Sequence, residues 1–150
     1  MTQITVSRDF RPATKAGLAD AAVLDPILDD VRARRRAAKL LAVRQGMLAR
    51  QRRQRYFSSK LFGDPAWDIL LELYAASLAD RRMTVSRLVT AAGVPMTTTL
   101  RWINTLEQDG LLIRQDHPLD RRQVYLSLSE EGCRVMDSYF EDLLPDTKLL

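Results

Sequence analysis

The sequence predicts a mainly α-helical fold with a small β-hairpin, in which a long basic amphipathic helix precedes a helix–turn–helix unit. Apolar residues recur at helical spacing over most of the chain, and they alternate over one short stretch near residue 125. Gly residues and Asp-Pro pairs separate these segments. We expect a flexible arm over 1–23, the basic helix within 24–60 and a helical domain with the hairpin over 61–150.

The composition excludes several classes of protein. The 150 residues are 46% hydrophobic and 28% charged, as in a globular protein. The sequence has no long apolar run and does not open on a signal-peptide pattern, so we expect a cytoplasmic protein. The single Cys133 and the single His117 exclude a disulfide framework and most metal sites. No nucleophile–base set, carboxylate pair or phosphate loop is visible, so we expect neither an enzyme nor a cofactor.

The positive charge is concentrated in the first part of the chain. The net charge is +4, but residues 1–60 carry 14 basic and 5 acidic side chains, against 9 and 14 over 61–150. Between Arg32 and Arg55, 10 of 24 positions are basic and none is acidic. This asymmetry predicts a polyanionic partner, with nucleic acid first and an anionic membrane surface second. We therefore expect double-stranded DNA and no membrane as the partner.

The basic segment is predicted to form a helix from about Pro26 to Phe57. Asp25 can cap its first turn, and Pro is tolerated at the first helical position. The apolar residues lie close to a 3.5-residue spacing, which indicates a narrow seam that packs against a partner. The arginines between them are either a solvated flank or contacts to a DNA backbone, and RNA or an acidic protein is a further alternative. The candidate backbone contacts are Arg50, Arg52, Arg53 and Arg55.

Three further helices are expected before the hairpin. Residues 66–79 are apolar on nearly every side, which is typical of a helix in the centre of a core. Thr84 can cap the next helix, and Gly93 supplies the turn after it. The following helix, 96–108, is predicted to bury Thr99, Trp102, Ile103 and Leu106.

The hairpin follows Gly110. Residues 111–115 are short and apolar, and 123–129 alternate between apolar and polar. The polar, proline-containing stretch 116–122 between them is predicted to be an extended basic tip. Ser129 then caps a last helix, Glu130 to Leu144.

Two helices joined by a Gly turn and followed by a hairpin with arginines at its tip are the order of a winged helix-turn-helix. In such a domain the second helix enters the major groove of DNA. The face of helix 96–108 that the core does not use carries small hydroxyls and one guanidinium, which can bond bases or phosphates. The alternative to DNA contact is that this face is an ordinary polar helix surface without a ligand. The candidate DNA contacts on this helix are Thr97, Thr98, Arg101 and Thr105.

Four stretches of the winged-helix part carry a family resemblance: Met83–Leu88 leading to Gly93-Val94, Thr97–Arg101, Leu106–Leu112, and Asp116–Gly132. By these stretches residues 66–144 resemble the MarR (multiple antibiotic resistance regulator) family of bacterial transcription factors. The resemblance implies a homodimer that reads a pseudo-palindrome and usually represses transcription.

The resemblance also implies roles for the wing. Arg121 or Arg122 would reach the minor groove, and Asp120 would hold one guanidinium in place. Arg87 and Arg114 are candidate phosphate contacts. The alternative is a solvated turn whose charges pair on the surface for little gain.

The sequence departs from the family after the wing, where one helix stands instead of the usual two. We therefore expect dimerisation through the Pro26–Phe57 helix and through four residues of the last helix, and we assign no small-molecule effector. We interpret Cys133 as a packed thiol rather than a redox sensor. The rival functions are a protein-interaction module and a non-specific architectural DNA-binding protein. The four dimer residues are Met136, Tyr139, Phe140 and Leu143.

Overall fold

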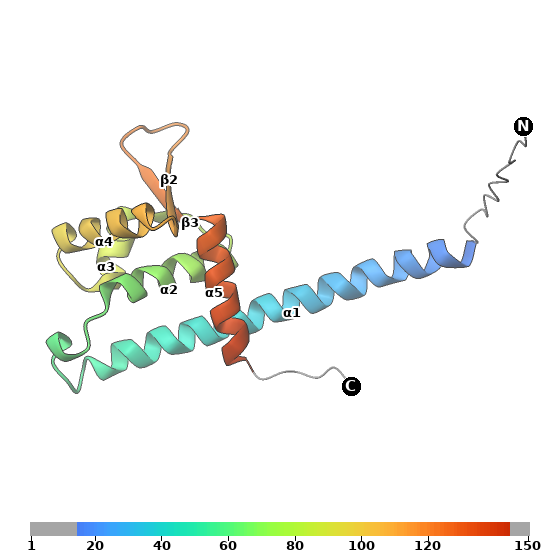
Figure 1. Ribbon diagram of the computed structural model, residues 1–150, viewed down its shortest axis with the longest axis horizontal. Helices are drawn as coiled ribbons and strands as arrows, with labels where there is room; N and C mark the ends of the chain where they lie inside the picture. Colours follow the sequence, from blue (N-terminus) through green and yellow to red (C-terminus); the bar gives the residue numbers. More distant parts are fainter. Residues whose placement is uncertain (1–14, 145–150) are drawn as a thin grey trace, which may run out of the picture. The chain divides into compact units, whose positions relative to one another are not determined.

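The computed structural model describes residues 15–144 and confirms a mainly helical fold with a small antiparallel sheet (Figure 1). The predicted order of elements is present, with one additional short strand before α3. The elements are α1 (Lys15–Arg53), η1 (Ser59–Leu61), α2 (Pro65–Leu78), β1 (Met83–Thr84), α3 (Val85–Ala92), α4 (Met96–Gln108), β2 (Leu112–Asp116), β3 (Val124–Leu128) and α5 (Glu130–Leu143).

The chain divides into two compact units, with the boundary after Arg35. The first unit contains the beginning of α1. Its exposed arginines form ion pairs one helical turn apart, Arg32 with Asp29 at 3.5 Å and Arg34 with Asp30 at 2.8 Å. Exposed pairs of this kind stabilise a helix by only about 0.3–0.5 kcal/mol. The second unit contains the rest of α1 and all other elements.

The first helix is longer at its N-terminal end than the sequence predicts. α1 begins at Lys15 rather than Pro26 and ends at Arg53 rather than Phe57. Residues 15–25 are rich in Ala and Leu, which favour helix strongly, so the chain is helical on both sides of the proline. The expected arm is therefore helical over 15–23, and residues 1–14 lie outside the described part. Neither α1 nor another helix within residues 15–144 combines the length and apolar character needed to cross a membrane.

The core of the second unit is built around α2, as its apolar sequence predicts. The helix begins where the Asp64 carboxylate accepts the N–H of Trp67 at 3.3 Å and Pro65 takes the first position. It packs on α3, α4 and β3, and Val43 of α1 belongs to the same buried cluster. The buried residues of α2 are Ile69, Leu71, Leu73, Tyr74, Ala75 and Ala76.

A cluster of charged and phenolic groups joins α1 to α2 and α5. Lys39 Nζ donates to Asp137 Oδ1 and to Glu141 Oε1, both at 2.8 Å, and Tyr74 Oη donates to Asp137 Oδ1 at 2.6 Å. Burial alone would raise the pKa of Asp137, but the hydrogen bonds from Lys39 and Tyr74 outweigh it and the pKa lies below its ordinary value. The carboxylate is therefore charged at neutral pH, and the cluster weakens when acid protonates it.

The last helix presents only part of the expected dimer face. Met136 and Phe140 are 2% and 4% exposed, and Phe140 stacks on Tyr74 with ring centroids 5.3 Å apart. These two side chains are buried in their own subunit, so their expected role at a dimer interface is wrong. Tyr139 and Leu143 lie on the outer side of α5 and are exposed.

The sheet has the order β1-β3-β2, with both neighbours antiparallel to β3. Met83 of β1 pairs with Leu126, and Leu112 of β2 pairs with Leu128. β1 has only two residues, which is too short for an alternating pattern to reveal it. Because β3 pairs on both sides, the hairpin is attached directly to the start of α3.

A close approach of two backbones fixes α5 against Leu111, the residue just before β2. Ser129 N donates to the Leu111 carbonyl at 2.9 Å, and Ser129 Oγ accepts the N–H of Gly132 at 2.9 Å. A Cβ atom at position 132 would lie 2.1 Å from the same Leu111 oxygen. Only glycine fits there, because the obstacle is main chain rather than a movable side chain.

We expect Gly132→Ala to lower the free energy of unfolding by about 1–3 kcal/mol, because the added methyl must displace the backbone at Leu111, just before β2. Chemical denaturation followed by circular dichroism measures this. The matched control is Gly46→Ala, since nothing lies within 4 Å of a Cβ there. The control should raise stability by about 0.5–1 kcal/mol, as Ala does in a helix interior. Equal stability of Gly132→Ala and the wild type would contradict the close approach.

Candidate nucleic-acid interface

The turn between α3 and α4 sets the direction of α4. Thr84 Oγ1 accepts the N–H of Arg87 at 3.4 Å and caps α3, as expected. Gly93 ends α3 with φ of +62°, a left-handed conformation that glycine adopts without strain. Pro95 then precedes the first residue of α4. These residues hold α3 and α4 as a rigid helix–turn–helix.

α4 turns one face to the core and leaves the other open. Thr99 and Ile103 have no exposed surface and Leu106 is 5% exposed, which confirms the predicted buried side. The Thr99 hydroxyl donates to the Pro95 carbonyl at 3.3 Å, which satisfies this polar group inside the core. Trp102 is half-buried at the edge of that side.

The four predicted contact residues of α4 lie outside the core. Thr97 and Arg101 are exposed, and Thr98 and Thr105 are half-buried. The Thr105 hydroxyl donates to the Arg101 carbonyl at 3.1 Å, so its oxygen remains available only as an acceptor. The guanidinium of Arg101 forms no ion pair with the described residues. The open face of α4 therefore offers one cation and several hydroxyls.

The wing is the β2–β3 hairpin, and main-chain hydrogen bonds close its tip. His117 N donates to the Gln123 carbonyl, and Gln123 N donates to the Asp120 carbonyl, both at 3.0 Å. Asp120 Oδ1 accepts the main-chain N–H of Arg122 at 3.0 Å. The expected support by Asp120 is thus exerted on the backbone of the turn, because no ion pair between Asp120 and either wing arginine forms in the described part of the chain.

His117 is a structural residue of the wing that the sequence pattern did not reveal. Its Nδ1 accepts two main-chain N–H groups, from Leu119 at 3.0 Å and from Asp120 at 2.9 Å. Its ring lies 5.2 Å from that of Tyr125 on β3. The polar stretch with Pro118 indicates a turn, but nothing in it distinguishes His117 as the acceptor that orders the turn.

The wing arginines stand at the outer end of the domain. Arg121 and Arg122 are both exposed, and neither forms an ion pair within residues 15–144. Arg122 and Gln123 line one side of a hollow of about 310 Å³, and Thr84 and Ser86 at the start of α3 line the other. The structure therefore brings one wing arginine next to the beginning of the helix–turn–helix.

Arg114 is engaged with α4 instead of being open to a ligand. Its Nε donates to Glu107 Oε2 at 2.8 Å, and its Nη2 donates to the amide oxygen of Asn104. The carboxylate neutralises the guanidinium, so this arrangement does not favour the expected phosphate contact. It joins the wing strand β2 to α4 by two side-chain bonds. Arg87, the other expected phosphate contact, is exposed on α3.

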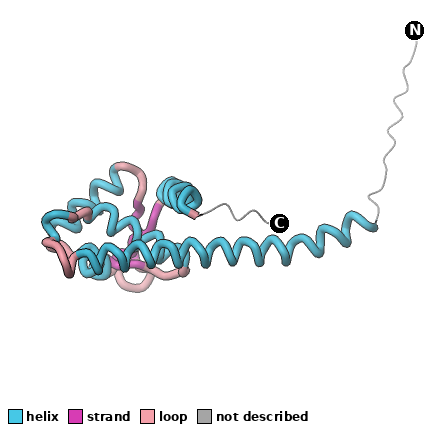
Figure 2. The backbone as a smooth tube through the Cα atoms, turned by 90° about the horizontal axis from the view of Figure 1, so that it is seen from below, coloured by secondary structure: helices cyan, strands magenta, loops and turns pink. Residues whose placement is uncertain are grey.

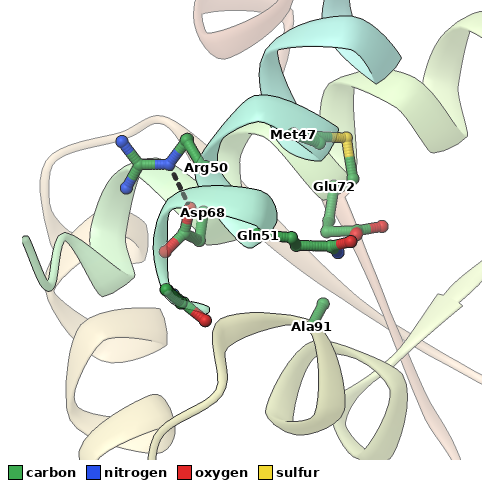
Figure 3. A pocket seen from close by; sticks show the side chains of 7 residues that line it. Met47, Arg50, Gln51, Asp68, Glu72 and Ala91 are labelled. Atoms are coloured by element: carbon green, nitrogen blue, oxygen red, sulfur yellow. Dashed lines mark hydrogen bonds and ion pairs between the residues drawn. The ribbon is translucent and has the colours of Figure 1, made fainter. Parts of the chain in front are cut away.

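The arginines of α1 lie on another side of the domain. Arg50 Nε donates to Asp68 Oδ1 at 2.6 Å, with side chains only 20% and 18% exposed, beside a water-sized hollow of about 30 Å³ (Figure 3). Arg53 lies over the ring of Phe62 at 4.4 Å. Arg52 and Arg55 are exposed.

α2 separates this part of α1 from α4 and the wing, and the view from below shows α1 in front of them (Figures 1 and 2). The structure does not bring these arginines together with the wing.

Glu72 and Cys133 lie outside the surfaces described so far, and each packs against neighbouring side chains. Glu72 lines the hollow of Figure 3, and burial raises its pKa although Arg81 and Arg87 act against the rise. The Cys133 thiol is half-buried, 3.9 Å from the hydroxyl of Ser77. Within residues 15–144 no three metal-binding side chains lie close enough to hold an ion.

Comparison with known proteins supports the resemblance. The model of the MarR family matches residues 64–124, from the cap of α2 to the start of β3. No protein of curated function matches the chain.

Solved structures of similar fold include MarR from E. coli, with 20% identity over 52% of this chain and 54% of that one and a TM-score of 0.45. A mutant of the E. coli protein complexed with operator DNA has 20% identity over 53% and 54%, with a TM-score of 0.45. The transcriptional repressor CouR, bound to a 23-mer DNA duplex, has 26% identity over 51% and 50%, with a TM-score of 0.42. The present chain spans about half the length of these structures.

We expect His117→Ala to loosen the wing tip, since the amides of Leu119 and Asp120 lose their acceptor. Their hydrogen exchange should become about three- to tenfold faster, because one such bond is worth about 0.5–1.5 kcal/mol. His117→Asn is the matched variant: its side-chain oxygen can take the place of Nδ1 and should preserve much of the protection. Equally fast exchange in both variants would show that the acceptor is not what orders the turn.

Proposed function

We propose that this chain, whose residues 64–124 match the model of the MarR family, is a sequence-specific regulator of transcription that binds double-stranded DNA. The single observation that carries the proposal is the open face of α4, where exposed Arg101 and Thr97 stand opposite the buried Thr99 and Ile103. A helix whose outer face offers donors and no carboxylate among its central residues is suited to a groove lined by acceptors.

In the proposed complex, α4 (about 96–108) lies in the major groove and its side chains read base edges. A guanidinium such as that of Arg101 can form two hydrogen bonds with guanine O6 and N7. Thr97 and Thr98 near the start of α4 would contact bases or phosphates, and the Thr105 oxygen can accept from a base amino group. The first helix of the pair, α3, would cross the phosphate backbone near Arg87.

The wing (about 116–122) would enter the adjacent minor groove through Arg121 or Arg122. A narrow A·T-rich minor groove has enhanced negative potential, so an inserted guanidinium discriminates by groove width. The exposed position of both side chains at the tip supports this role. Arg52 and Arg55 lie beyond α2 and have no part in the proposed contact.

We propose further that the chain acts as a homodimer and a repressor. In the second unit, Leu41 and Leu48 of α1 and Tyr139 and Leu143 of α5 are large apolar side chains with exposed surface, as a subunit interface requires. A two-fold dimer places its half-sites about one helical turn, roughly 10–10.5 base pairs, apart. A dimer that occupies both grooves of such a site excludes other proteins from it, which is a physical basis for repression.

Selection of bound fragments from random DNA gives the preferred site, and Arg101→Ala then tests base reading. We expect a loss of about 1–3 kcal/mol on the selected site and a much smaller loss on random duplex, because only the selected site offers the matched base. Fluorescence anisotropy at one fixed salt concentration measures both. Gln108→Ala, an exposed change at the end of the same helix, is the control. Equal losses on the two duplexes would remove Arg101 from base recognition, and a failed selection would favour an architectural or protein-binding role.

The salt dependence of binding separates the two groups of arginines. Arg121→Gln with Arg122→Gln should reduce the slope of log K against log salt by up to about 1.8, since each phosphate that a cation neutralises adds about 0.9 to the slope. Arg52→Gln with Arg55→Gln removes the same charge and should leave the slope nearly unchanged, because α2 holds these residues away from the duplex. A larger change in the second pair than in the first would contradict the proposed orientation.

A further inference from the structure

The connection between α1 and α2 forms a corner of the domain that the DNA-binding proposal does not use. It contains four large apolar side chains with exposed fractions of 82% for Tyr56, 54% for Phe57, 68% for Leu61 and 41% for Phe62. Three exposed cations lie among them. We call this surface the basic aromatic corner: Arg52, Arg55, Tyr56, Phe57, Lys60, Leu61 and Phe62.

The corner is an ordered surface. Phe57 and Phe62 meet edge to face with ring centroids 5.6 Å apart, and the Arg53 guanidinium covers the ring of Phe62 at 4.4 Å. A short helical turn, Ser59–Leu61, closes the connection. Phe57 and Phe62 are thus positioned by contacts within the corner. All four apolar side chains would have a lower free energy in an apolar environment than in water.

The electrostatics of the corner favour an anionic partner. The sequence has no Asp or Glu from residue 31 to residue 63. The nearest acidic side chains are engaged, Asp64 as the cap of α2 and Asp68 with Arg50. The cations of the corner form no ion pairs within residues 15–144, so their charge is not compensated locally.

We propose that the basic aromatic corner binds the surface of an anionic phospholipid membrane. Aromatic and leucine side chains enter the boundary between headgroups and acyl chains, while Lys and Arg remain at the phosphates. Two such signals together, apolar insertion and a basic patch, are what stable anchoring at a membrane surface requires. The sequence led us to expect no membrane partner, and this proposal replaces that expectation for a surface contact.

Three other occupants are less compatible with the corner. A nucleic-acid strand could stack its bases only on Tyr56 and Phe57, because Arg53 covers Phe62, and it would leave the apolar Leu61 in water. A peptide would need a groove, and neither hollow described above is lined by residues 55–62. A second copy placed here by two-fold symmetry would bring cations against cations.

The corner also lies away from the proposed DNA contact. In Figure 1 it joins α1 to α2 on the side of α2 opposite the wing. The proposal is independent of the DNA-binding proposal, since neither surface contributes a residue to the other.

Co-sedimentation of the full chain with phosphatidylcholine vesicles, with and without phosphatidylserine, tests the proposal. We expect binding to the anionic vesicles at low salt. Arg52→Gln, Arg55→Gln and Lys60→Gln together should lower the partition coefficient about a hundredfold, at about fivefold per cation. The matched control neutralises three cations of the other side, Arg87, Arg121 and Arg122, and should have a much smaller effect. Equal losses in the two triple variants, or no binding by the wild type, would overturn the proposal.

The apolar contribution is tested by Tyr56→Ser with Phe57→Ser, which should weaken binding about tenfold or more. Leu119→Ser, at a side chain 91% exposed on the wing, is its control. Phe57→Ser also removes the contact with Phe62, so thermal unfolding of both variants is measured and vesicle binding is compared at a temperature at which both are folded. Unaltered vesicle binding by the double variant would overturn the proposal. It would also be overturned if the double variant instead lost single-stranded DNA binding, which would indicate stacking, or dissociated into monomers, which would indicate a subunit interface.

Discussion

The need to cover α2 on nearly every side determines the arrangement of the second unit. Tyr74, Ile69 and Leu73 of this helix are almost completely buried, and they require neighbours in several directions. α3, α4 and β3 pack on it, and α1 and α5 complete the shell through Val43, Phe140 and the Lys39 cluster. The arginines at the end of α1 and those of α4 and the wing therefore belong to surfaces on different sides of the domain.

Local signals were sufficient to predict most of the fold. The caps Asp64, Thr84 and Ser129 mark the starts of α2, α3 and α5, and Gly93 marks the turn between α3 and α4, because each acts within a few residues. The start of α1 was misplaced because Pro26 suggested a boundary, whereas Ala-rich sequence continues the helix on both sides. β1 depends on pairing with β3, far along the chain, and its two residues carry no period of their own.

The exposure of a candidate residue could be predicted where it follows from the helical period. It could not be predicted where the side chain binds a residue of another element. The period alone separates buried Thr99 from exposed Thr97 and Arg101 on α4. Sequence spacing did not reveal that Glu107 would neutralise Arg114 or that Asp68 would hold Arg50, since these contacts arise only when separate elements pack. The acceptor role of His117 likewise depends on the closed geometry of the wing tip.

The bonds from Arg114 to Glu107 and Asn104 have a mechanical consequence for the proposed regulator. They tie the strand that leads into the wing to the last turns of α4, so the hairpin and the helix are held at one angle. A helix and a hairpin held at a fixed angle fit two neighbouring grooves only when the grooves have a matching separation. The protein would then discriminate among duplexes by curvature and helical pitch, even where the bases that touch it are identical.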